Sequence, residues 1–351
     1  MVFVKVGLAR AAAVEWVMEQ ASQMNGFRGA YFSGSTVGLP DDAELSVASD
    51  VDVVIVTEHS EPPPKLGKFI YRDTLVEATY LPWKLLASVE EVLTSYHLAG
   101  SFRVDTIISD PTGHLSRLQK QVSRHFAEEL WVRRRCENAR QKVEIGLRAI
   151  DISAPLHDQV MSWMFPGGVT THVLLLAALR NPTVRLRYLA AREVLMEYGY
   201  DSLYEDLLKL LGCANLTPER VEQHLDELAR TFDDTAGVAK TPFFFSTDIT
   251  AKARPIAIDG SRELIRAGNH REAVFWIVAT FARCHKILEV DATPELQRAH
   301  YPAFAAIVAD LGITSSADII RRAEDVIKFL PRLWETTEEI LLANPNIEAA
   351  K

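Results

Sequence analysis

The sequence predicts an α+β protein in which a small mixed sheet is followed by a larger all-helical domain. Short runs rich in β-branched residues and bounded by turn residues are concentrated before about residue 110. After that point apolar residues recur at helical spacing almost to the C-terminus. With 351 residues, 48% hydrophobic and 24% charged, the chain is long enough for two domains. We therefore expect an α/β domain at 1–113 and a helical domain at 114–351.

The first domain is expected to contain five strands with flanking helices. Helical patterns occur at about Ala11–Met24 and Trp83–Tyr96. The run Pro62–Pro64 cannot lie inside a sheet, so it is expected to connect two strands. The expected strands are Gly29–Phe32, Val51–Val56, Lys68–Tyr71, Leu75–Leu81 and Arg103–Ile108.

The second domain begins after the turn signal Asp110–Gly113. The stretch Leu115–Ile150 is expected to form one long helix or two abutting ones, and Thr241–Ile258 a loop or a short hairpin. N-terminal capping signals are present at Thr217, Thr293 and Ser316. The remaining expected helices are Thr170–Leu179, Thr183–Tyr198, Ser202–Leu211, Thr217–Thr231, Ser261–Leu288, Pro294–Leu311 and Ser315–Leu342.

Charge and composition narrow the classes of partner. The formal net charge is −9, and residues 1–110 carry 8 Lys/Arg against 15 Asp/Glu, so a nucleic-acid partner is not expected. Apolar runs such as Val173–Leu179 and Val274–Ala282 are shorter than a membrane span, and the N-terminus lacks a signal-peptide pattern. The cysteines at 136, 213 and 284 are far apart, which favours buried free thiols. We expect a cytoplasmic protein without a membrane partner.

An acidic pair at the start of the second expected strand is the strongest functional signal. Asp50 and Asp52 are two residues apart, so in a strand they point to one face, while Val51 and Val53 point to the other. Two adjacent carboxylates repel each other unless a proton, a hydrogen bond or a cation intervenes. Hard oxygen ligands of this kind suit Mg²⁺, which completes its shell with water and substrate phosphates.

A phosphate-binding element precedes that pair. In the segment Gly34-Ser35-Thr36, the glycine allows close approach of backbone N–H groups to a phosphate, and the Ser35 hydroxyl can donate to one of its oxygens. A helix beginning near Ser35 would add a favourable partial charge. A phosphate cradle beside metal-binding carboxylates is the combination that phosphoryl or nucleotidyl transfer requires.

A third carboxylate is expected nearby. We choose Glu77, because it lies in an otherwise apolar or β-branched strand and therefore needs a partner. Asp105 is the alternative, although it can instead pair with Arg103 or lie outside the site on an edge strand.

These residues resemble the nucleotidyltransferase superfamily of DNA polymerase beta, and within it the antibiotic (kanamycin-type) nucleotidyltransferases. The resemblance covers roughly residues 28–115 and also matches the order of a mixed domain followed by a helical one. It implies that Gly34 and Ser35, with Thr36 beside them, hold the phosphates of ATP or another nucleoside triphosphate. Asp50 and Asp52 would bind Mg²⁺, and Glu77 would complete the metal site or act as base.

The activity implied by this resemblance is transfer of a nucleoside monophosphate to a hydroxyl of a small, aminoglycoside-like or other acceptor, with release of pyrophosphate. A homodimer is a further implication. Two alternatives stay open: a non-catalytic nucleotide-sensing or protein-interaction module, and a nucleotidyltransferase that modifies a protein.

The helical domain offers further candidates. The segment Arg117–Arg148 carries nine Lys/Arg against four Glu, a charge that either meets a triphosphate or forms a solvated face. Glu137 and Glu144 are seven residues apart, on one helical face, and are alternative general bases. The histidines show no metal-ligand spacing and receive no role.

Overall fold

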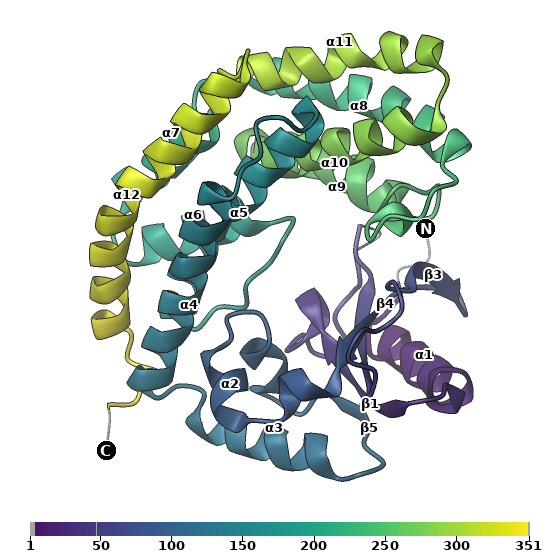
Figure 1. Ribbon diagram of the computed structural model, residues 1–351. Helices are drawn as coiled ribbons and strands as arrows, with labels where there is room; N and C mark the ends of the chain where they lie inside the picture. Colours follow the sequence, from purple (N-terminus) through teal and green to yellow (C-terminus); the bar gives the residue numbers. More distant parts are fainter. Residues whose placement is uncertain (1–3, 47, 350–351) are drawn as a thin grey trace. The chain divides into compact units, whose positions relative to one another are not determined.

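The computed structural model describes residues 4–46 and 48–349, which belong to two compact units. The first unit comprises Met1–Arg135 with Glu348–Lys351, and the second comprises Cys136–Ile347. A five-stranded mixed sheet spans residues 27–109, and helices dominate from His114 to Ala343 (Figure 1). The predicted α+β class, with a mixed sheet followed by a larger helical region, is confirmed.

The sheet has the strand order β3-β4-β2-β1-β5. Its central pair, β2 and β4, is parallel, whereas β1 is antiparallel to β2 and β5, and β3 is antiparallel to β4. Residues Arg72 and Asp73, both with positive φ, form the two-residue turn between β3 and β4. The strands are β1 Phe27–Ser33, β2 Val51–Thr57, β3 Gly67–Tyr71, β4 Thr74–Pro82 and β5 Ile107–Ser109.

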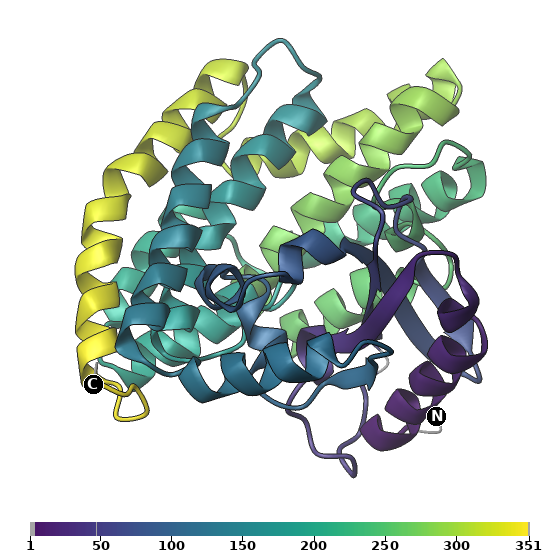
Figure 2. The same cartoon turned by 60° about the horizontal axis from the view of Figure 1, so that its bottom comes forward.

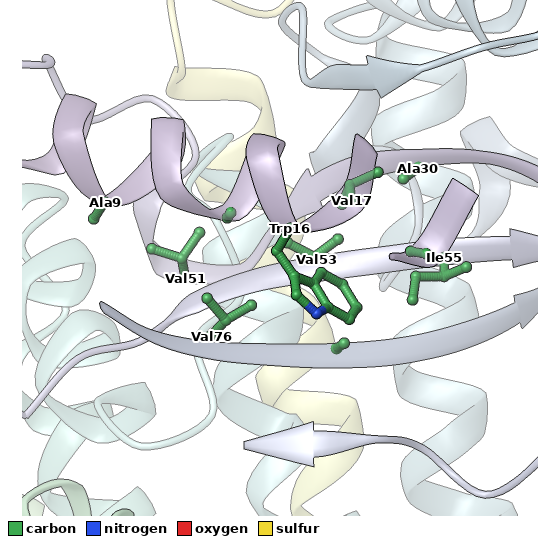
Figure 3. Close-up of a cluster of buried hydrophobic side chains, with 11 residues drawn as sticks. Ala9, Trp16, Val17, Ala30, Val51, Val53, Ile55 and Val76 are labelled. Atoms are coloured by element: carbon green, nitrogen blue, oxygen red, sulfur yellow. The ribbon is translucent and has the colours of Figure 1, made fainter. Parts of the chain in front are cut away.

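One face of the sheet is covered by helix α1 (Val6–Glu19). Because strand side chains alternate, Val51, Val53 and Ile55 of β2 all face this helix. Trp16 of α1 packs into the same cluster, which also contains Val76 of β4 (Figure 3). The alternate residues of β2, Asp52, Val54 and Val56, therefore point to the opposite face.

On that opposite face the sheet is apolar at one end only. Tyr31 of β1 and Val56 of β2 pack with residues of α2 (Val89–Thr94) and α3 (His114–His125). A short 3₁₀ segment, η4 (Ala99–Phe102), contributes to the same cluster. The first residues of β2 lie beyond these apolar contacts and are free to carry a polar site.

The second unit is a helical assembly. Helix α4 (Glu129–Arg148) begins in the first unit and ends in the second. Within the second unit α5 lies beside α12, and α10 packs on both α5 and α8 (Figures 1 and 2). The helices after α4 are α5 Leu156–Ala177, α6 Arg187–Glu197, α7 Asp201–Leu211, α8 Pro218–Val238, α9 Gly260–Arg266, α10 His270–Asp291, α11 Pro294–Asp310 and α12 Ser316–Ala343.

Several predicted elements differ from the structure at their boundaries. The strand expected at Arg103–Ile108 is only Ile107–Ser109, because the residues before it form η4 and a loop. The helix expected at Trp83–Tyr96 is interrupted, because Ser88 adopts an extended conformation and caps α2 by accepting a hydrogen bond from the Glu91 amide at 3.3 Å. The first helix starts earlier than expected, at Val6.

The stretch Leu115–Ile150 forms two helices, α3 and α4, which is one of the two predicted arrangements. The helix expected at Ser261–Leu288 is broken by Gly268, whose φ of +80° ends α9 before α10 begins. The segment Thr241–Ile258 contains only a 3₁₀ turn and the start of a π-helical turn, so no hairpin forms there. The capping residues Thr217 and Thr293 are confirmed, and the third cap is Ser315 instead of Ser316.

One helix of the described residues, α5, is long and apolar enough to span a bilayer, which the sequence prediction did not anticipate. Pro166 and the polar residues Thr170, Thr171 and His172 interrupt its apolar run in sequence but not its helix. Within the most apolar window of α5, 72% of the residues are buried inside the protein, as in the core helix of a soluble protein. The three cysteines are buried thiols that form no disulfide with one another, as predicted.

Candidate active site

Strand register brings four polar side chains into one row. Asp52 of β2 is paired with Glu77 of β4 on one side and with Ser33 of β1 on the other. Lys68 of β3 is in turn paired with Glu77. Residues that are directly opposite on neighbouring strands project to the same face of a sheet. Lys68, Glu77, Asp52 and Ser33 therefore cross four adjacent strands side by side, on the face away from α1.

Asp50 joins this row from the residue before β2. It precedes Asp52 by two positions and so shares its face. One carboxylate oxygen from each of Asp50, Asp52 and Glu77 lies within 4.8 Å of the other two. The three carboxylates chosen from the sequence are thus close enough to share one cation, and we call them the acidic triad.

Gly34 lies directly against the triad. β1 ends at Ser33, and the chain turns at Gly34 with a φ of +70°, a conformation that favours glycine. A methyl group at Gly34 would overlap Oδ2 of Asp52 and lie 2.5 Å from its Cγ. Glycine is therefore needed here both for the backbone conformation and for the close approach of the main chain to the Asp52 carboxylate.

The segment after Gly34 is a three-residue 3₁₀ turn, Gly34–Thr36, and not the start of a helix. The favourable partial charge that a helix beginning near Ser35 would add is therefore not available from this turn. Ser35 is exposed, with its hydroxyl open to solvent, whereas Thr36 is fully buried. Arg10 of α1 donates to the carbonyl of Thr36, and to that of Leu39 at 3.0 Å, and so ties this turn to the helix.

Two lysines that were not predicted as site residues contact the triad. Lys68 Nζ donates to both Asp50 and Glu77, and Lys65 Nζ donates to the second oxygen of Glu77. The Lys68 side chain is only 8% exposed. The signal that could have found Lys68 is the two-residue turn Arg72-Asp73, which sets Lys68 opposite Glu77 in the hairpin.

The carboxylates differ in their electrostatic surroundings. Burial, followed by repulsion from Asp50 and Glu77, raises the pKa of Asp52 well above its usual range. Burial also raises the pKa of Asp50, although Lys68 opposes the shift. Burial of Glu77 acts in the same direction, but Lys68 and Lys65 outweigh it and lower the pKa of Glu77 to about 2.

Asp52 is the carboxylate that most needs a further cation. Within the described part of the chain no hydrogen bond or ion pair joins its side chain to another residue. Three carboxylates face these two ammonium groups, so the Asp52 carboxylate is left to be neutralised by a proton or by a further cation. An oxygen-only donor set with excess negative charge fits a hard divalent cation such as Mg²⁺.

The other sequence candidates lie elsewhere. Asp105 is exposed in the loop before the edge strand β5, and its Oδ1 accepts the Ile107 amide at 3.2 Å. Glu137 and Glu144 belong to the second unit, where Glu144 accepts a hydrogen bond from Arg148 at 2.8 Å. Their role as general bases stays a prediction.

A second group of possible ligands occurs in the helical unit. Atoms of His157 and Asp158 on α5 and of Glu289 on α10 lie within 4.8 Å of one another. Lys286 donates to Asp158 at 2.7 Å and lies 3.6 Å from Glu289. This group, the α5–α10 cluster, was not predicted, because residues on its two helices are far apart in sequence: 128 positions separate Asp158 from Lys286.

Neither the comparison with known protein families nor the comparison with curated proteins gave a match for this chain. A functional assignment consequently depends on the geometry and chemistry of the site.

Proposed function

We propose that this protein is a Mg²⁺-dependent nucleotidyltransferase that transfers a nucleoside monophosphate from ATP or another nucleoside triphosphate to a hydroxyl of a small acceptor. The observation that carries the proposal is the convergence of Asp50, Asp52 and Glu77 on one sheet face, directly against the backbone of Gly34. Metal-binding carboxylates beside an open glycine–serine turn are the parts that such a reaction needs.

Asp50, Asp52 and Glu77 are the residues that would hold Mg²⁺. When bound, the metal supplies positive charge that offsets the charge of the phosphates and of the oxygens that react. The exposed hydroxyl of Ser35 is available as a donor to a phosphate oxygen. Gly34 leaves room for a phosphate to approach the main chain, because it has no side chain to exclude it.

In the proposed reaction an acceptor oxygen forms a bond to the α-phosphorus, the bond from that phosphorus to the bridging oxygen breaks, and pyrophosphate leaves. The acceptor proton passes to a carboxylate. Glu77 is the base candidate within the triad because it lies next to the proposed metal ligands, although a pKa lowered to about 2 makes it a weak base. Glu137 and Glu144 are the candidates from the second unit.

The experiment that tests this function follows the fate of labelled ATP in the presence of Mg²⁺. Label at the α-phosphate should move to an acceptor while label at the γ-phosphate appears in pyrophosphate. A panel of hydroxylated small molecules, aminoglycosides included, is compared with cell protein to separate small-molecule from protein acceptors. Transfer of γ-label to the acceptor would contradict the proposal, because it indicates a kinase.

The contacts of Lys68 and Lys65 favour a second candidate, a non-catalytic module that senses nucleotide or binds a protein. Lysine ammonium groups compensate two of the three negative charges, as in a structural ion-pair network. Calorimetry with ATP and Mg²⁺ separates the two: a sensor binds ATP without turnover, whereas an interaction module does not bind it.

A further inference from the structure

The cations nearest to the acidic triad are the chain's own lysines. Lys68 occupies one oxygen of Asp50 and one of Glu77, while Lys65 occupies the other oxygen of Glu77. Only the Asp52 carboxylate is left without such a contact in the described residues. Two of the three carboxylates that would hold a metal are therefore already engaged.

A divalent cation and an ammonium group cannot share these oxygens without strong repulsion. At about 4 Å, two like charges repel by several kcal/mol at the effective dielectric constant near a protein surface. Binding of a metal consequently has to displace Lys68. Because the Lys68 side chain is 8% exposed, the displaced ammonium is poorly placed to be solvated by water, and an anion that arrives with the metal would stabilise it.

A polyphosphate is an anion of the right kind. Lys68 has a flexible four-carbon stem with a compact charge, so its ammonium can move while its backbone stays in β3. The backbone position is held by the hairpin with β4, in which Lys68 is paired with Glu77. The nucleotide would thus accept the ammonium at the same time as the carboxylates accept the metal.

We propose that Lys68, assisted by Lys65, is an intramolecular counter-ion that couples metal binding to nucleotide binding. Without nucleotide, Lys68 competes with the metal for Asp50 and Glu77 and keeps metal affinity low. With nucleotide, Lys68 pairs with phosphate and the competition ends. This inference rests on the proposed function, because it assigns the triad to a metal and the neighbouring surface to a nucleotide.

The test measures Mn²⁺ binding without nucleotide, by electron paramagnetic resonance of the free ion and by calorimetry. The Lys68→Met variant should bind Mn²⁺ about tenfold more tightly than the unaltered protein, within the range of about 5- to 150-fold typical of coupled sites. Lys65→Met should show a smaller gain, because Lys65 contacts one carboxylate of the triad whereas Lys68 contacts two. Lys68→Arg, which keeps a positive charge, should not show the gain.

Lys5→Met is the matched control. Lys5 belongs to the same unit and pairs with Glu44 at 3.6 Å on the surface, so its replacement changes the net charge without touching the triad. Its Mn²⁺ affinity should equal that of the unaltered protein. Binding of ATP in excess chelator provides the reciprocal measurement, and there Lys68→Met should bind more weakly by a similar factor.

Each outcome is decisive. Equal or weaker Mn²⁺ binding by Lys68→Met, with binding abolished in Asp52→Asn, overturns the counter-ion proposal and leaves the metal site standing. No Mn²⁺ binding in any variant, with or without ATP, overturns the proposed function as well. If Lys68→Met unfolds without metal, its thermal midpoint is measured against Mn²⁺ concentration: a larger metal-induced increase than in the unaltered protein supports the proposal, and an equal one contradicts it.

Discussion

The two carboxylate clusters of this protein have similar composition and very different construction. In the acidic triad the carboxylates come from adjacent strands, and the side chains of Asp50 and Glu77 are 13% and 15% exposed. In the α5–α10 cluster the side chains of Asp158 and Glu289 are 32% and 41% exposed and come from two helices. Each cluster has a lysine between two carboxylates.

The two clusters differ in how far neighbouring groups and water offset the negative charge of their carboxylates. Lys286 can exchange its partners for water, because its side chain is 29% exposed, so the α5–α10 cluster is stable as a solvated ion-pair network. Asp52 is half-buried, no lysine among the described residues contacts its carboxylate, and the main chain of Gly34 lies directly against it. Strand register and the close approach of Gly34, and not the number of acidic residues, distinguish the triad as the candidate site.

The largest effect is expected on enzymatic activity, which substitutions in the triad should greatly reduce and substitutions in the α5–α10 cluster should leave almost unchanged. Asp52→Asn or Asp50→Asn should lower Mg²⁺-dependent pyrophosphate release at least about 100-fold, because each removes a charged ligand from the proposed metal site. Glu289→Gln should leave the rate within about twofold, since the α5–α10 cluster has no assigned part in the reaction. Asp105→Asn is the control from the sheet unit, and a large loss there would refute our choice of Glu77 over Asp105.

Two glycine-to-alanine substitutions test the close contact between the main chain of Gly34 and the Asp52 carboxylate. Gly34→Ala should destabilise the protein by about 2–5 kcal/mol, the sum of a left-handed alanine and an overlap with Asp52. Gly199→Ala should cost only about 1–2 kcal/mol, because Gly199 has a similar φ of +79° but no atom within 4 Å of the added carbon. Urea unfolding measures both, and equal losses would show that the contact with Asp52 is unimportant.

Protonation should affect the helical unit first. His172 is buried and hydrogen-bonded to the Thr183 carbonyl at 2.9 Å, and burial followed by the charge of Arg187 lowers its pKa to about 3. The unfolded chain therefore binds a proton near pH 6.5 that the folded chain does not, and stability is lost as the pH falls below that value.

For His172 the expected loss is about 2 kcal/mol between pH 6.5 and 5, at about 1.4 kcal/mol per pH unit. Urea midpoints at several pH values check this, and His172→Gln should flatten the curve. His285, whose burial lowers its pKa to about 4, contributes in the same direction and should keep part of the slope in that variant. An unchanged slope would contradict the assignment to His172.

The smallest effect is expected in the α5–α10 cluster itself. Lys286→Met should cost less than about 1 kcal/mol, because partly exposed ion pairs contribute little after solvent screening. Thermal unfolding at low and high salt measures it. A loss of several kcal/mol in the free energy of unfolding would show that the carboxylates of this cluster depend on their lysine as much as those of the triad do. The contrast between the two clusters, on which the choice of candidate site rests, would then disappear.

Much of the sheet could be predicted because its strands carry local signals. The expected Val51–Val56 and Leu75–Leu81 match β2 and β4 to within one residue at each end, since alternating β-branched residues and turn residues delimit them. The predicted bounds of edge strand β5 were less accurate, because a strand of three residues is too short to show a clear alternation of apolar and polar residues. The boundaries at Ser88 and Gly268 were missed because a single cap or left-handed residue overrides a continuous helical pattern.

The amino-acid sequence alone determined the α+β class, the shared face of Asp50 and Asp52, and the choice of Glu77, because these follow from local periodicity and chemistry. Only the tertiary structure decided that Glu77 pairs in register with Asp52, that Gly34 has no room for a side chain, and that Lys65 and Lys68 engage the carboxylates. The reason is physical: strand order and register depend on packing between segments far apart in the chain. Outside a hairpin, whose turn fixes its register, a residue's neighbours across a sheet cannot be identified from its own local sequence.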